Sequence, residues 1–229
     1  MAEYEATKKN KVLRERQFAK YDKETVFGVL DAGIVAHVSF VVQEEGQGPV
    51  PYTIPMLYAR DGEALYIHGS SASRLLKLMK SEAQVCICVT LLDGIVLARS
   101  IFNHSVNYRS VVLWGKPTLV VEEGEEKMRA LERLSVALTS QERWNEARAP
   151  TPAELKATSI VKVHIDTASA KVRSGLNDDD KADVDGIHGV WAGYVPIEKR
   201  WGAPVGDTQG TIPPFPPHLQ AMFSAPPPL

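Results

Sequence analysis

The sequence of 229 residues lacks any apolar run close to the roughly 20 residues that a helix needs to cross a bilayer. Residues 1–24 carry positive charge with no apolar stretch behind it, which is not the pattern of a secretory signal. We therefore expect no membrane partner and a cytoplasmic location.

Cysteine is scarce, since Cys86 and Cys88 are the only two in the chain. They stand two residues apart, so on a strand both would point to the same face. A disulfide across that spacing is geometrically poor, and two sulfur ligands alone do not make a zinc site. We predict that both are small apolar core residues and that the chain holds no metal site.

An excess of basic charge is also lacking, because 26 Lys and Arg face 28 Asp and Glu and the formal net charge is −2. Nucleic-acid-binding domains usually show a clear basic excess, so no nucleic-acid partner is expected. The sequence has no P-loop, no dinucleotide fingerprint, no His-Glu-x-x-His motif and no Gly-x-Ser-x-Gly motif. Its six histidines are scattered and show no metal-ligand spacing.

The composition is that of a globular domain, with 44% hydrophobic and 24% charged residues. Apolar segments rich in β-branched residues and bounded by turn residues predict strands. These segments are 33–42, 51–58, 64–68, 84–92, 95–100, 108–121 and 159–165. The pairs Asp61-Gly62 and Asp93-Gly94 are predicted turns between strands.

Helical spacing of apolar residues predicts two helices. One is short and follows residue 70, with Ser70 or Ser71 as its N-cap. The other spans 124–148, and its apolar face is formed by Met128, Leu131, Leu134 and Leu138. Together the elements predict a mainly β fold, a small closed or nearly closed antiparallel barrel with helices packed outside it.

Three regions are expected along the chain: an N-terminal arm or helix over 1–24, a central domain over 25–200, and a Pro-rich tail over 201–229. Eight of the 15 prolines follow residue 203, so the tail is predicted to be extended or to wrap a neighbour. Residues 178–183 are predicted to form a solvated acidic loop.

The segment His68-Gly69-Ser70-Ser71-Ala72-Ser73-Arg74 is the first candidate site, because it joins a predicted strand to a helix. Free amides, hydroxyls and a guanidinium at a helix start suit a phosphate monoester, although a plain capped helix explains the same residues. Three further segments are weighed against ordinary strand entry, edge-strand or core roles. They are 52–58 with its internal proline, 107–110 with Tyr and Arg, and 191–196 with Trp and Tyr.

Five segments taken together, in order over roughly residues 15–200, resemble the pyridoxamine 5'-phosphate oxidase-like FMN-binding split-barrel family. The resemblance is to its flavin-nucleotide-binding and nitroimidazole-resistance-like branch. The matching stretches are 66–74, 93–100, 104–112, 170–175 and 191–196.

This resemblance implies a six-stranded antiparallel split β-barrel (Greek key) with flanking helices. It also implies a homodimer with FMN in clefts at the dimer interface. The backbone of 55–57 would border the flavin ring, His68, Ser73 and Arg74 would hold the ribityl phosphate, and Trp191 could come from the partner subunit. The implied cofactor-binding residues are Pro55, Met56, Leu57, Tyr58, His68, Gly69, Ser73, Arg74, Tyr108, Arg109, Ser110 and Trp191.

The sequence departs from the vitamin-B6 oxidase itself, because no basic residue lies within 54–58 and no arginine follows Arg200. Oxidation of a phosphorylated pyridoxamine is therefore not expected. The first hypothesis is an FMN-dependent oxidoreductase that passes electrons from NADH or NADPH to a small organic substrate, with unknown catalytic side chains. The second is a non-catalytic flavin carrier or sensor, and the third is a haem-binding split-barrel protein.

Overall fold

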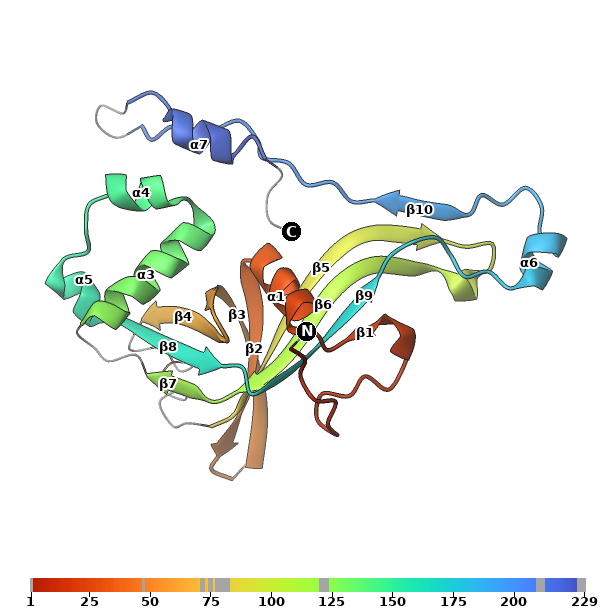
Figure 1. Cartoon of the computed structure of the whole chain (residues 1–229), viewed down its shortest axis with the longest axis horizontal. Coiled ribbons are helices and arrows are strands. Elements are labelled where there is room, and N and C mark those ends of the chain that lie inside the picture. Colours follow the sequence, from red (N-terminus) through yellow and green to blue (C-terminus); the bar gives the residue numbers. More distant parts are fainter. Residues whose placement is uncertain are drawn as a thin grey trace.

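The computed structural model describes residues 2–46, 48–70, 73, 76, 83–119, 124–208 and 213–225. In this part of the chain, ten strands form one antiparallel sheet (Figure 1). The strands are β1 (Ala19–Lys20), β2 (Val35–Glu44), β3 (Gly48–Asp61), β4 (Ala64–Ser70), β5 (Val85–Leu97), β6 (Ser105–Gly115), β7 (Pro117–Leu119), β8 (Thr158–His164), β9 (Thr167–Arg173) and β10 (Gly193–Pro196).

The helices pack around this sheet and along the C-terminal segment. They are α1 (Lys23–Ala32), α3 (Glu125–Leu138), α4 (Gln141–Glu146), α5 (Pro152–Ala157), α6 (Lys181–Gly186) and α7 (Pro217–Met222), with 3₁₀ turns η1 (Arg16–Phe18) and η2 (Ile101–Asn103). The predicted mainly β, antiparallel fold with flanking helices is confirmed. No helix of the described residues is long and apolar enough to span a membrane.

The strands pair in the order β1-β9-β6-β5-β2-β3-β4-β8-β7, and β10 pairs with β5. Among the described residues this is an open order, so the finer prediction of a closed six-stranded barrel is not confirmed by it. Alternation along β2 explains the core, because Ala36, Val38 and Phe40 are buried while Val35 and His37 are exposed.

The predicted turn at Asp93-Gly94 is wrong, because both residues lie inside the continuous strand β5. The register with β6 shifts between Leu92 and Gly94, which marks a β-bulge. A Cβ atom on Gly94 would lie 2.9 Å from the Val195 carbonyl oxygen of β10. Glycine at this position therefore permits close approach of a third strand, and the dipeptide does not reverse the chain.

The predicted helix over 124–148 is two helices, because the chain breaks at Thr139 and Ser140 and the Ser140 side chain caps α4. The buried face of α3 also differs from the predicted one. Ala130 and Leu134 are buried, whereas Leu138 is 38% exposed.

Helix α1 is an element that the sequence analysis missed. Its Asp22 cap accepts a hydrogen bond from the Thr25 amide at 2.8 Å, and Val26, Val29 and Leu30 are buried. Their spacing of three and four residues was the available signal.

The N-terminal residues are attached to the sheet along part of their length. Tyr4 and Asn10 are buried, and Asn10 Nδ2 donates a hydrogen bond to the Ala168 carbonyl of β9 at 2.9 Å. Strand β1 then pairs with β9.

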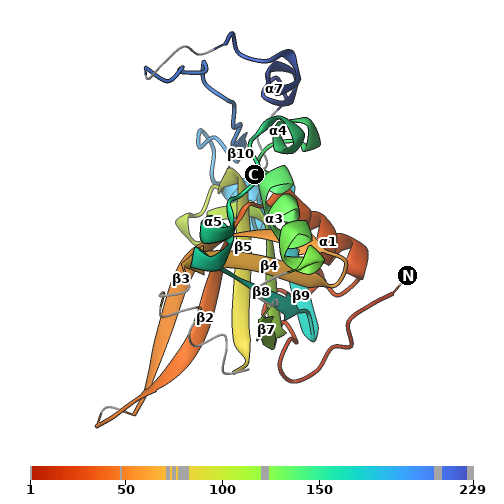
Figure 2. The ribbon, with the colours of Figure 1, turned by 90° about the vertical axis from the view of Figure 1, so that its left-hand side faces the viewer.

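After β9 the chain leaves the main body, passes through α6 and returns along β5 as β10 (Figure 1). It ends with α7 beside α4, an arrangement that Figure 2 shows from a second direction. The predicted solvated acidic loop is partly wrong. The Asp179 side chain is 1% exposed and accepts hydrogen bonds from the Arg99 backbone and guanidinium.

Candidate functional site

The end of β4 carries His68, whose neighbour in β8 is Ile160. The His68 Nδ1 atom is buried and has no hydrogen-bond partner among the described residues. Burial lowers the pKa of this imidazole, which favours the neutral form. A buried nitrogen without a hydrogen-bond partner destabilises the fold unless a ligand binds it. His68 is therefore a candidate ligand-binding residue at the end of β4.

His68 borders an open cavity of about 480 Å³ between β4, α3 and α5. Its other lining residues are Leu131, Arg148, Pro150, Glu154, Leu155 and Thr158. Arg148 and Glu154 form an exposed ion pair with each other at 2.7 Å, and neither of them forms an ion pair with His68.

The turn after β4 is closed by Ser73. Its amide donates to the Ser70 carbonyl at 2.9 Å, and its hydroxyl accepts from the Leu76 amide at 3.2 Å. The Ser73 hydroxyl thus accepts the kind of hydrogen bond that an N-cap residue accepts, while the predicted cap at Ser70 or Ser71 stays a prediction. Ser71 and Arg74 lie outside the described residues, so the proposed phosphate contact of Arg74 stays a prediction.

Gly69 packs closely beneath this turn. A Cβ atom there would lie 3.2 Å from Leu76 Cδ1. The absence of a side chain thus lets a fully buried leucine cover the end of β4.

On β3, Pro55 and Leu57 face outward, and Met56 packs against the core. Tyr58 is 3% exposed and its hydroxyl donates to the Leu30 carbonyl. Burial raises the pKa of Tyr58. The side chain of Tyr58, one of the predicted flavin contacts, therefore points into the core and not toward a ligand at the surface.

On β6, Arg109 forms a two-pronged ion pair with Asp93, at 2.9 Å from Nε and 2.7 Å from Nη2. This partner raises the pKa of Arg109 and occupies its guanidinium. Ser110 is 3.5 Å from the Lys171 carbonyl, and Tyr108 lines a separate cavity near η1 and η2.

Among the described residues, those predicted on β3 lie next to those on β4, whereas those predicted on β6 lie farther away in the strand order. Strands β3 and β6 are separated by β2 and β5, which places them about 14 Å apart at the usual strand spacing. Trp191 is 63% exposed on the segment before β10, and its ring contacts Gly193.

The two cysteines lie on the outward face of β5, where they share one side as predicted but are half-buried. The prediction of fully buried core residues is wrong because their side chains alternate with the core residues Val85, Ile87 and Val89. Burial, and then the neighbouring Cys88, raise the pKa of the Cys86 thiol.

This outward face crosses three paired strands and carries no formally charged side chain. We call it the uncharged face, and its residues are Val35, His37, Ser39, Val41, Pro51, Thr53, Pro55, Leu57, Cys86, Cys88, Thr90 and Leu92. Four of its apolar side chains, those of Val35, Val41, Leu57 and Leu92, are exposed, and neighbouring exposed apolar side chains are typical of a surface that another molecule covers.

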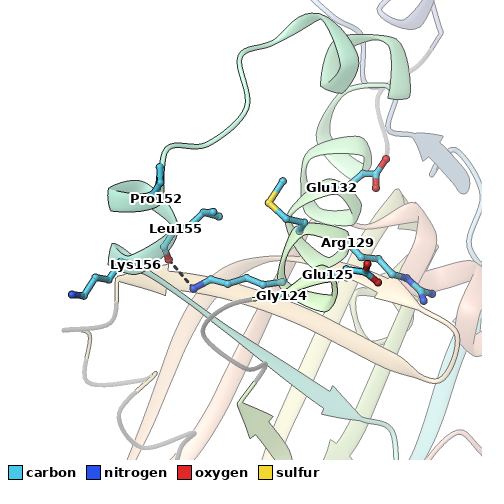
Figure 3. A pocket seen from close by; sticks show the side chains of 9 residues that line it. Gly124, Glu125, Arg129, Glu132, Pro152, Leu155 and Lys156 are labelled. Carbon is cyan, nitrogen blue, oxygen red and sulfur yellow. Dashed lines mark hydrogen bonds between the residues drawn. The ribbon is translucent and has the colours of Figure 1, made fainter.

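A second cavity, of about 780 Å³, lies between α3 and α5 (Figure 3). Lys127 lines it, is 3% exposed, and donates from Nζ to the Leu155 carbonyl at 2.7 Å. The sequence analysis missed this lysine, although its position three residues before Ala130 places it on the buried side of α3.

Comparison with known proteins identifies relatives of nearly full length. The chain is 34% identical to the flavocytochrome Anf3 from Azotobacter vinelandii, with a TM-score of 0.83 over 94% of this chain and 97% of that one. It is 32% identical to an FAD- and haem-binding protein from Mycobacterium smegmatis, with a TM-score of 0.81 over 90% and 97% of the two chains.

A candidate 5-nitroimidazole antibiotic resistance protein from Bacteroides thetaiotaomicron shares the fold at 21% identity, with a TM-score of 0.55 over 67% of this chain and 86% of that one. No curated protein sequence matches the chain. The model of the pyridoxamine 5'-phosphate oxidase family matches residues 22–172. The chain therefore belongs to the pyridoxamine 5'-phosphate oxidase family.

Proposed function

We propose that this protein binds a flavin nucleotide together with haem and passes electrons through them as an oxidoreductase. The observation that carries the proposal is the pair of similar structures, a flavocytochrome and an FAD- and haem-binding protein, each matched over at least 90% of this chain. Haem was the third hypothesis from the sequence, and these relatives now favour it over a flavin alone.

For the flavin, the chemistry of the donor groups fits a nucleotide. The turn at Ser73 would meet the phosphate end, and the exposed residues Pro55 and Leu57 would border the ring. The resemblance in sequence suggests FMN, whereas the M. smegmatis relative binds FAD. We therefore propose FAD as the flavin and FMN as the alternative.

For the haem, His68 would hold the iron through its imidazole, because burial favours the neutral ring and its Nδ1 has no hydrogen-bond partner among the described residues. Haem would supply one-electron chemistry that complements the two-electron chemistry of a flavin. His68 would then bind iron and would not hold the flavin phosphate, in contrast to the role implied by the sequence resemblance.

We also propose that the uncharged face pairs two chains in a homodimer, which would bring Trp191 of one chain to the flavin of the other. The sheet would close into a six-stranded barrel in which β6 with β7, and β8 with β9, each form one bent strand. Only Lys116 separates β6 from β7, and only Ile165 and Asp166 separate β8 from β9, so β4 connects through β8 and β9 back to β6.

The test of function is the cofactor content of the purified protein. We expect a flavin band and a Soret band in the visible spectrum, with FAD identified by mass after acid extraction. Anaerobic NADH or NADPH should then reduce the flavin first. Binding without reduction by either nicotinamide would favour the non-catalytic carrier.

His68→Ala should abolish the Soret band and leave the flavin band in place, because the iron loses its ligand. His188→Ala is the control, since His188 is exposed on the C-terminal segment. Loss of flavin with retention of haem in His68→Ala would contradict the haem assignment and restore the phosphate role of His68.

A further inference from the structure

A third cavity lies where η1, η2, β6 and β9 come together, and in the strand order β5, β2 and β3 separate β6 from β4. We call it the η1–η2 cavity. It has a volume of about 380 Å³, and Arg14, Phe18, Phe102, Tyr108, Arg173 and Asp178 are among its lining residues. That volume lies within the usual range for small-molecule sites.

The first feature of the cavity is a buried arginine whose positive charge is only weakly neutralised by a carboxylate. The Arg173 side chain is 8% exposed, and its guanidinium donates to the neutral oxygens of Asn107, at 2.8 Å, and Leu176, at 3.2 Å. The nearest carboxylate that pairs with it, Asp178, is 3.9 Å away and 86% exposed. A solvated carboxylate at that distance neutralises a buried charge poorly.

The second feature is an additional cation at the rim. Arg14 is exposed and makes no ion pair or hydrogen bond among the described residues. The adjacent carboxylate of Glu15 accepts a hydrogen bond from Gln17 at 2.6 Å. Glu15 also has φ of 53°, the only positive φ of a non-glycine residue in the described chain. Backbone strain of this kind is concentrated at functional sites.

The third feature is aromatic surface around these cations. Phe18 lies beneath the Arg173 guanidinium, 5.8 Å from carbon to ring centroid. Phe102 is 89% exposed, and Tyr108 completes the aromatic lining. A large apolar ring left in water beside a cavity is a suitable surface for another flat ring.

We propose that the η1–η2 cavity binds a planar aromatic anion, with its ring against the aromatic side chains and its carboxylate or phosphate at Arg14 and Arg173. The site involves neither His68 nor the turn at Ser73, and of the cofactor-binding residues implied by the sequence resemblance only Tyr108 lines it. Bidentate pairing of arginine with a carboxylate or phosphate supplies the selectivity for an anion.

The experiment is calorimetric titration of the purified protein, with its cofactors bound, against two matched pairs of probes. Benzoate is compared with benzamide, and adenosine monophosphate with adenosine. We expect at least one anion to bind tenfold or more tightly than its neutral partner. The pair that shows the larger ratio identifies the anion as a carboxylate or a phosphate.

Two variants test the residues. Arg14→Gln should reduce the affinity for the anion toward that of the neutral probe, and Phe102→Ala should weaken both members of the pair about tenfold. The controls are Arg16→Gln and Ile101→Ala, because neither residue lines the cavity although Ile101 is 87% exposed. Both controls should bind as the unchanged protein does.

Three outcomes would overturn the proposal. Equal affinity for the charged and neutral probes would exclude anion recognition. Release of flavin or haem by the probes would assign the cavity to a cofactor. A change of oligomeric mass in Phe102→Ala, with unchanged affinity, would make Phe102 a subunit contact. Cofactor content is measured separately, so failure here is distinguishable from failure of the proposed function.

Discussion

Two phenol groups, those of Tyr4 and Tyr58, are buried against the core of the sheet. Burial is the main cause that raises the pKa of Tyr4 from 10.0 to about 12, and it raises the pKa of Tyr58 as well. A group whose pKa is higher in the folded state stabilises the fold fully below its unfolded pKa. That stabilisation is lost as the pH rises above it. The free energy of unfolding should therefore fall from about pH 10 upward.

Tyr58→Phe should make that alkaline loss less steep, because one titrating group is removed. At neutral pH the same change should cost about 1–2 kcal/mol, since the buried Leu30 carbonyl loses its donor. Urea unfolding at pH 7 and between pH 9 and 12 measures both effects. Tyr194→Phe, at an exposed position, is the control, and an alkaline profile of Tyr58→Phe that matches it would show that Tyr58 does not contribute.

At the scale of elements, α3 is attached to the sheet by a small apolar cluster. Leu134 and Ala130 pack with Ala59, Tyr66 and Ile160 of β3, β4 and β8. Leu134→Ala should destabilise the protein by about 2–4 kcal/mol through lost burial and a new cavity. Leu138→Ala, one turn later and 38% exposed, should cost clearly less. Equal losses of unfolding free energy would show that α3 packs by a different face.

The contact between β5 and β10 depends on Gly94, which pairs with Pro196. Gly94→Ala should detach β10, because the new methyl group would lie 2.9 Å from a backbone oxygen. Limited proteolysis should then cleave the segment after β9 faster than in the unchanged protein. Gly28→Ala in α1 is the control, since no atom lies within 4 Å of the new methyl group. Unchanged cleavage in Gly94→Ala would mean that other contacts retain this segment.

At the scale of the whole molecule, the segment after β9 exposes many large apolar side chains. Leu176, Trp191, Tyr194, Val195 and Val205 are each at least 43% exposed. Together with the uncharged face, they favour a second chain as the covering surface. Light scattering should give twice the mass of one chain at micromolar concentration. Trp191→Ser should weaken that dimer, and His188→Ser should not. A single-chain mass for the unchanged protein would contradict the shared cleft.

Local chemistry made several elements predictable. The β-branched segments at 33–42, 64–68 and 159–165 correspond to β2, β4 and β8, and the Asp61-Gly62 turn lies between β3 and β4, with Gly62 at φ of +60°. Apart from α1, whose apolar spacing is a local signal, the features that the sequence did not predict involve neighbours far away in sequence. The bulge in β5 lies where β10 pairs with Gly94, and the buried side of α3 packs against β3, β4 and β8.

The sequence by itself determined the mainly β, antiparallel character of the chain, because side-chain alternation and turn residues act within a few positions. Its segments also carried the resemblance that the family match bears out. Only the tertiary structure decided what each polar residue faces. The Nδ1 atom of His68 is buried without a partner among the described residues, and Arg109 pairs with Asp93. Arg173 lines a cavity together with residues of the N-terminal segment. Charge pairing and desolvation depend on distances between remote segments, which spacing along the chain does not specify.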